Sequence, residues 1–129
     1  MTSQTGRCLC GAVRYRFSGG MLWAGFCHCE SCRRNTSSPV TAFFGTPRAG
    51  FAFEGDEPGA YTSSPGVIRR FCRTCGTPMS FERASLPDEI HLYAVSLDDH
   101  SDFAPERHGY WSERVAWLSI ADDLPKDEH

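Results

Sequence analysis

Residues 8–17 read CLCGAVRYRF, and this stretch combines the two features that decide the fold. Cys8 and Cys10 are separated by one residue and followed by a glycine, and after them apolar and charged side chains alternate strictly. In a β-strand the apolar residues from Val13 to Phe17 would share one face, with the arginines between them on the other. The stretch therefore predicts a half-buried strand directly after a pair of possible metal ligands.

Short apolar stretches separated by glycine and proline continue along the chain, which is typical of a mainly β domain. Residues 89–96, EIHLYAVS, are apolar on nearly both faces, and this predicts a central strand. We expect about eight short strands, one helical turn near Glu30–Arg34, and few or no long helices. The other strands are expected at residues 22–27, 40–44, 51–53, 67–72 and 79–82, with edge structure at 110–111 and 115–118.

The chain of 129 residues is long enough for one domain with a buried core. We assign residues 1–121 to this domain and expect residues 122–129, DDLPKDEH, to form a frayed acidic tail. The formal net charge of −3 argues against nucleic acid or an acidic membrane as a partner, because both attract basic surfaces. No feature of the sequence indicates an oligomeric state.

The expected location is the cytoplasm, since the first residues carry no apolar segment typical of a secretory signal. The apolar stretches are also too short to span a bilayer, so no membrane partner is expected. In a reducing compartment cysteines are more often metal ligands than disulfides. The seven cysteines are odd in number, so they cannot all pair within the chain. Both points favour metal binding.

The cysteines form three groups along the chain: Cys8-x-Cys10, Cys27-His28-Cys29-x-x-Cys32 and Cys72-x-x-Cys75. The last group has the spacing of a zinc knuckle, and Gly76 after it can adopt the positive φ of a tight turn. Cys8 and Cys10 would lie on one face of an extended segment. Neither pair alone fills a tetrahedral shell, but together they supply four thiolates, a closed structural set that would join the start of the chain to its middle.

Residues 26–34, FCHCESCRR, contain the other three cysteines. Cys27 and Cys29 would share one face, Cys32 would return to it after one turn, and His28 would point away. Three protein ligands with one vacant position are the pattern of a catalytic zinc. Two alternatives stay open: His28 completes a closed site with the three thiolates, or the thiols are buried without metal. Zinc is favoured over iron as the metal.

Other functions match parts of this pattern. His28-Cys29-Glu30 and Cys72-x-x-Cys75 match elements of zinc deaminases, but Phe71 replaces the expected proline and five cysteines would go unused. A sulfoxide reductase would need a free catalytic cysteine, and none remains when two metal sites are filled. The stronger alternative to an enzyme is a non-enzymatic zinc-scaffolded binding module.

An ordered series of motifs resembles the glutathione-dependent formaldehyde-activating enzyme family, which also contains centromere protein V. The motifs are CLCGAV at 8–13, CHCESCR at 27–33, RFCRTCGT at 70–77, SLDD at 96–99, Pro105 to His108, Trp117, and Leu124-Pro125. The resemblance implies a fold like that of methionine sulfoxide reductase B and two Zn²⁺ ions per chain. The implied ligands are Cys8, Cys10, Cys72 and Cys75 for a structural zinc, and Cys27, Cys29 and Cys32 for a catalytic one.

The resemblance also implies a carbon–sulfur lyase of the S-(hydroxymethyl)glutathione synthase type. Such an enzyme adds a thiol, here glutathione, reversibly to formaldehyde. With glutathione as the implied thiol, the non-enzymatic alternative also includes a glutathione carrier. A thiol that enters the vacant zinc position would lose its proton, because the metal stabilises the thiolate. Arg33 and Arg34, with Arg69 or Arg70, are candidates to offset the negative charge or bind the carboxylates of glutathione. His108 is a candidate to line the substrate pocket.

Overall fold

Residues 13–17 form a strand, as their alternation predicts, in a computed structural model that describes residues 3–129 of the chain. The side chains of Val13, Tyr15 and Phe17 are fully buried, whereas the two arginines between them face solvent. The ring of Phe17 lies 5.4 Å from the ring of Phe44 across the core. Full burial of such side chains stabilises a fold by about 1.5–3 kcal/mol each, so this strand contributes strongly to the core.

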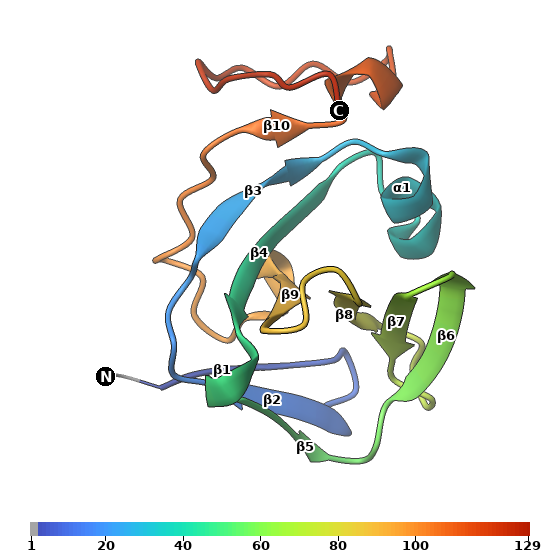
Figure 1. Cartoon of the computed structure of the whole chain (residues 1–129), viewed down its shortest axis with the longest axis vertical. Coiled ribbons are helices and arrows are strands. Elements are labelled where there is room, and N and C mark those ends of the chain that lie inside the picture. Colours follow the sequence, from blue (N-terminus) through green and yellow to red (C-terminus); the bar gives the residue numbers. More distant parts are fainter. Residues whose placement is uncertain (1–2) are drawn as a thin grey trace.

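Two sheets enclose this core (Figure 1). The smaller sheet is antiparallel and consists, in spatial order, of β1 (Gln4–Arg7), β2 (Val13–Phe17) and β5 (Phe51–Gly55). The larger sheet consists, in spatial order, of β10 (His108–Gly109), β3 (Trp23–Cys27), β4 (Thr41–Pro47), β9 (Glu89–Tyr93), β8 (Pro78–Arg83), β7 (Val67–Phe71) and β6 (Gly59–Ser64). Its pairs are antiparallel except for β10 and β3, which run parallel.

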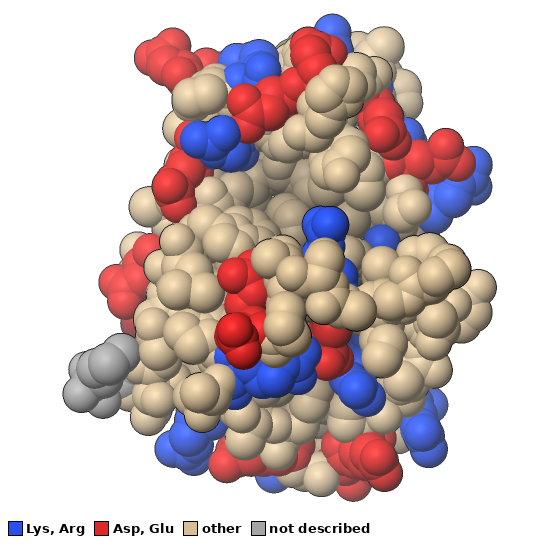
Figure 2. Space-filling view, viewed as in Figure 1, with Lys and Arg blue, Asp and Glu red and all other residues tan. Residues whose placement is uncertain are grey.

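One α-helix and three 3₁₀ turns complete the described part of the chain. They are α1 (Glu30–Thr36), η1 (Arg48–Gly50), η2 (Ala94–Ser96) and η3 (Trp111–Glu113). The predicted mainly β class with few helices is therefore confirmed. None of the helices among these residues has the length and apolar character that a membrane span requires. On the face shown in Figure 2, basic and acidic side chains are interspersed.

The central strand of the larger sheet is β9, which lies fourth among seven, as the apolar character of residues 89–96 predicts. Its side chains are buried from Ile90 onwards, because the strand is paired on both edges and covered on both faces. The strand is shorter than predicted: it ends at Tyr93, and the chain continues as η2.

Three strands, β1, β6 and β10, are missing from the predicted set, and each lies at a sheet edge. β1 and β6 each pair with one neighbour only, and five of the six residues of β6 retain solvent exposure. Such strands need no alternating apolar face, so the sequence pattern does not reveal them. The edge structure predicted at residues 110–111 and 115–118 is wrong. Tyr110 has a left-handed backbone (φ 54°) that starts η3, and residues 115–118 are not in a strand.

The segment after Asp122 lies against β10 (Figure 1), so the prediction of a frayed end is wrong for residues 122–127. The amide of His108 donates to the carbonyl of Pro125 (2.9 Å), and the amide of Asp127 donates back to the carbonyl of His108 (2.8 Å). A further backbone hydrogen bond joins Trp111 to Asp127. These bonds place the C-terminal segment along the outer edge of β10. On its other side β10 pairs with the end of β3, where the chain enters the FCHCESCRR segment.

Candidate functional site

The first candidate site is formed by Cys8, Cys10, Cys72 and Cys75, whose sulfur atoms all lie within 4.8 Å of one another. The Sγ of Cys10 is 3.6 Å from that of Cys8 and 3.8 Å from that of Cys72. Cys8 and Cys72 are buried in the core between the two sheets. The structure therefore brings together the four cysteines that the sequence groups as one closed metal site, here called the four-cysteine centre.

Two tight turns build the four-cysteine centre, and both end in a glycine with positive φ: Gly11 (82°) and Gly76 (81°). In each turn a backbone amide donates to a cysteine sulfur, from Val13 to Cys8 and from Cys75 to Cys72. Against the effect of burial, the bond from Val13 helps to lower the pKa of the Cys8 thiol, which favours the thiolate form that binds metal. The extended conformation predicted for residues 8–10 is wrong, because a turn rather than strand alternation brings the first two sulfurs together.

The second candidate site is formed by Cys27, Cys29 and Cys32, here called the three-cysteine centre. Cys27 is the last residue of β3, and Cys29 caps the N-terminus of α1 by accepting a hydrogen bond from the amide of Cys32 (3.3 Å). The short helix thus returns Cys32 to the side of the other two sulfurs. No fourth metal-binding side chain joins this group among residues 3–129, and His28 points to His108 instead.

The three thiols influence one another electrostatically. Hydrogen bonds from Cys27 and Cys32 lower the pKa of the Cys29 thiol, and the charge of Arg69 lowers it further. The hydrogen bond to Cys29 raises the pKa of Cys27 in turn. One thiol of the group therefore ionises readily and disfavours ionisation of its neighbour. A cation bound among the sulfurs would allow all three to be thiolates, which is the donor set of a metal site.

Arg69 of β7 is a buried cation beside this centre. Its Nη1 lies 3.9 Å from the sulfur of Cys32, its Nε donates to Ser63 (3.1 Å), and its guanidinium lies over the ring of Phe81. Only 6% of its surface is exposed. A buried arginine requires nearby negative charge or hydrogen-bond acceptors, and the thiolates supply that charge.

The three-cysteine centre opens into a cavity of about 870 Å³ on one face of the larger sheet. All three cysteines line it, and neighbouring strands in register supply its far wall: Arg69 pairs with Phe81, and Phe81 with His91. The aromatic and polar side chains on this wall are Trp23, Phe43, Phe81, Glu89 and His91. A small molecule can therefore reach the sulfurs from a partly apolar cavity, as in many ligand sites.

His91 and Glu89 on this wall were not predicted as site residues from the sequence. The Nε2 of His91 lies 2.7 Å from Glu89, which also accepts a hydrogen bond from Trp23 (3.0 Å). Burial lowers the pKa of His91. A signal was present in the sequence: two polar residues at alternate positions of a strand predicted to be central, where buried polar groups need a reason.

The substrate residues predicted from sequence lie away from this cavity. Arg34 is exposed and forms an ion pair with Glu30. Arg33 donates from Nε to the carbonyl of His28 (3.1 Å), which ties α1 to the end of β3. His108 has no exposed surface. Of the arginines considered from sequence, the structure brings Arg69 to the cysteines.

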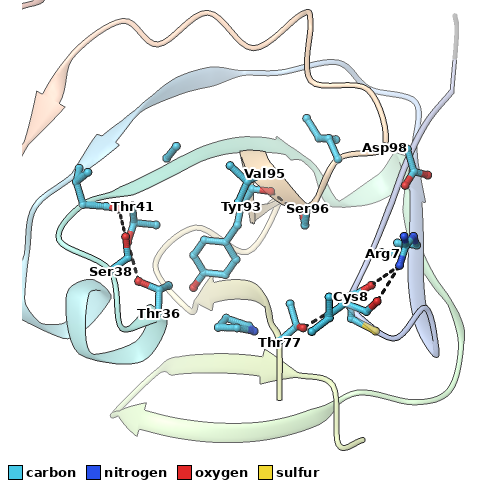
Figure 3. Close-up of a pocket in the computed structure, with 15 residues that line it drawn as sticks. Arg7, Cys8, Thr36, Ser38, Thr41, Thr77, Tyr93, Val95, Ser96 and Asp98 are labelled. Atoms are coloured by element: carbon cyan, nitrogen blue, oxygen red, sulfur yellow. Dashed lines mark hydrogen bonds between the residues drawn. The ribbon is translucent and has the colours of Figure 1, made fainter. Parts of the chain in front are cut away.

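A second cavity of about 620 Å³ lies beside the four-cysteine centre (Figure 3). Cys8 lines it, whereas the cysteines of the three-cysteine centre do not. The ring of Tyr93 projects into it, between Thr36 and Thr77. Its hydroxyl groups are already engaged: Thr36 with Thr41, Thr77 with Cys75, and Ser96 with Tyr15. Because each of these hydroxyl groups already has a hydrogen-bond partner, the cavity offers less reactive chemistry than the cavity at the three-cysteine centre.

A sequence model described as glutathione-dependent formaldehyde-activating enzyme matches residues 3–113, which include both centres. The chain belongs to this family. The resemblance carried by the cysteine motifs is therefore confirmed.

Two individual proteins are similar to this chain. An uncharacterized lyase of Schizosaccharomyces pombe is 37% identical over 81 residues, a match that covers 63% of this chain and 58% of that protein. A crystal structure of a Rhodobacter sphaeroides protein superimposes with a TM-score of 0.61 at 25% identity, covering 73% of this chain and 87% of the other. The fold is thus shared with a solved structure.

Proposed function

We propose that the chain is a zinc-dependent carbon–sulfur lyase that adds a thiol such as glutathione reversibly to a small aldehyde such as formaldehyde. The observation that carries this proposal is the position of the three-cysteine centre. Three sulfurs within 4.8 Å of one another line a cavity of about 870 Å³, with a buried arginine beside them. An incomplete ligand set that is open to a cavity is the arrangement of catalytic rather than structural metal sites.

The proposal places one Zn²⁺ at each centre. Four thiolates around a tetrahedral zinc at about 2.3 Å lie roughly 3.8 Å apart. The 3.6 Å and 3.8 Å separations from Cys10 to Cys8 and Cys72 fit this geometry before any metal is added. The four-cysteine centre would be structural. At the three-cysteine centre, zinc would stabilise the thiolate form of an incoming substrate thiol at neutral pH.

The protein's own residues would then bind and orient the reactants. In the reaction, the thiol sulfur forms a C–S bond with the aldehyde carbon, and the thiol proton ends on the carbonyl oxygen. Arg69 would offset the negative charge that an added thiolate brings to the site. The aromatic wall of Trp23, Phe43 and Phe81 would displace water from the carbonyl. Because the substrate thiol must be reduced, we place the protein in the reducing cytoplasm.

The test combines metal analysis with a thiol titration and an assay. We expect anaerobically purified protein to contain two zinc ions per chain and to respond to glutathione at only one of them. With glutathione and ¹³C-formaldehyde, NMR exchange spectroscopy should show S-(hydroxymethyl)glutathione forming faster than the spontaneous reaction. Two zinc ions that are indifferent to glutathione, with no acceleration, would favour the binding-module alternative. Thiol binding without acceleration would favour a glutathione carrier.

Arg69→Gln should slow adduct formation about 10–100-fold, because a charge-assisted interaction of about 1.5–3 kcal/mol is lost. The same assay measures the rate, with zinc content as a check on the metal sites. The matched control is Arg16→Gln, because Arg16 forms only an exposed ion pair with Glu54 on the other sheet and such pairs contribute little. Equal rates of adduct formation for the two variants would show that Arg69 has no role in the proposed reaction.

A further inference from the structure

A chain of hydrogen-bonded side chains lies behind the three-cysteine centre. The Nε2 of His28 is 2.8 Å from the Nδ1 of His108, and the Nε2 of His108 is 2.8 Å from the Oδ2 of Asp122. His108 is completely buried and His28 is 3% exposed. The rings of Phe26 and Trp111 enclose the pair, with centroids 5.0 Å and 5.1 Å from that of His108. Charged and polar groups in such surroundings persist only when they are paired.

The order of the chain fixes the position of each hydrogen. The hydrogen bond from His108 lowers the pKa of Asp122, so this residue is a carboxylate and accepts from Nε2–H of His108. In a neutral ring the Nδ1 of His108 is then an acceptor, which requires the hydrogen of His28 to be on Nε2. Asp122 thereby sets the tautomer of a neutral His108 ring, and His108 in turn sets the tautomer of His28.

His28 is connected to all three cysteines of the centre, to two through the backbone and to the third through α1. It stands between Cys27 and Cys29 in the sequence, and its amide donates to the carbonyl of Gly109 in β10 (3.0 Å). Its own carbonyl accepts a hydrogen bond from Arg33, which lies next to Cys32 in α1. A shift of the His28 backbone would consequently displace its two neighbouring cysteines directly and Cys32 through the helix.

The second ring nitrogen of His28 supports this role. Its Nδ1 is buried and has no hydrogen-bond partner among residues 3–129. The bond to His108 is therefore the one hydrogen bond that the described residues give this ring, and its loss would leave both nitrogens of a buried ring unpaired, which costs free energy.

We propose that Asp122, His108 and His28 form a positioning chain for the three-cysteine centre, with Asp122 as its anchor. Asp122 lies beyond the residues that the family sequence model matches. The C-terminal segment thereby becomes part of the metal site, although it supplies no ligand. This inference concerns the geometry of the centre and holds whatever reaction occurs there.

The experiment uses the full chain with zinc at the four-cysteine centre and cobalt(II) added to the three-cysteine centre. Asp122→Ala should weaken cobalt binding 10–100-fold in competition with a chelator, the usual loss when outer-sphere partners of a metal site are removed. It should also change the visible absorption bands of the cobalt–thiolate site. Asp122→Asn keeps an oxygen acceptor and should recover part of the affinity. Asp123→Ala, an exposed neighbour, is the control and should behave as the unmodified chain.

¹⁵N NMR of the histidine rings reports their tautomers, which a general loss of stability in a folded variant would not change. In the unmodified chain, the Nδ1 of His28 and the Nδ1 of His108 should both carry the shift of a nitrogen without hydrogen. In Asp122→Ala this fixed tautomer pattern should be lost. Unchanged cobalt affinity and ring shifts in a folded Asp122→Ala or Asp122→Asn protein would overturn the proposal. So would equal weakening of both metal centres, because that indicates a general structural effect. Neither thiol nor aldehyde is used, so this result is independent of the proposed reaction.

Discussion

Cys72→Ser is expected to remove most of the stability of the fold, because it takes one of the four proposed zinc ligands from the four-cysteine centre. Structural zinc contributes about 10–16 kcal/mol of binding free energy in small zinc domains, which is comparable to the whole stability of an ordinary domain. Cys72 is 1% exposed and belongs to the core cluster, so its loss also disturbs packing. We expect a decrease of at least several kcal/mol in the free energy of unfolding, measured by urea denaturation followed by circular dichroism.

The position of this centre explains why the effect should be large. It joins the turn before β2 to the turn between β7 and β8, and so connects the smaller sheet to the far side of the larger one. Treatment of the unmodified chain with a strong chelator should reproduce the loss. If Cys72→Ser and the chelated protein unfold at the same urea concentration as the untreated chain, the four sulfurs do not hold a structural metal and hydrophobic packing alone maintains the fold.

The parts of the fold that the sequence predicts are those whose signal is local. β2 follows from the alternation of five residues, and β9 from an apolar run that only a central strand can bury on both faces. β1 and β6 lie at sheet edges, where no alternating face is required. β10 and the residues after Asp122 pair with each other through backbone groups, and backbone pairing leaves little trace in side-chain pattern.

The same distinction separates the predicted from the unpredicted parts of the site. Both sets of cysteines follow from short spacings and from the count of ligands that a tetrahedral metal needs. Arg69, Phe81 and His91 reach the cavity because the consecutive strands β7, β8 and β9 pair in one register and lie beside a cysteine that is 37 residues before Arg69. The link from His108 to Asp122 likewise depends on the C-terminal segment packing on β10. Such contacts are decided by tertiary structure, so single-sequence patterns cannot supply them.

Cys29→Ser should abolish the proposed reaction while the fold remains intact. The substitution leaves two thiolates at the three-cysteine centre, too few to retain zinc with an open position. It also removes the thiol whose pKa is lowered by Cys27, Cys32 and Arg69. We expect adduct formation to fall at least 100-fold, equivalent to about 2.7 kcal/mol of transition-state stabilisation, and the zinc content to fall by about half. The rate is measured by ¹³C-formaldehyde exchange and the metal by elemental analysis.

Serine is the suitable replacement because Cys29 also caps α1. Its sulfur accepts the hydrogen bond from the amide of Cys32, and serine is among the most favourable N-cap residues, so the helix should persist. Ser31→Ala is the control: Ser31 lines the same cavity in the same turn but is not one of the grouped sulfurs. If Cys29→Ser unfolded together with the four-cysteine centre, the two metals would form one structural unit. If it instead catalysed as fast as Ser31→Ala, the reaction would not occur at these cysteines, and the cavity would have to serve as a binding site alone.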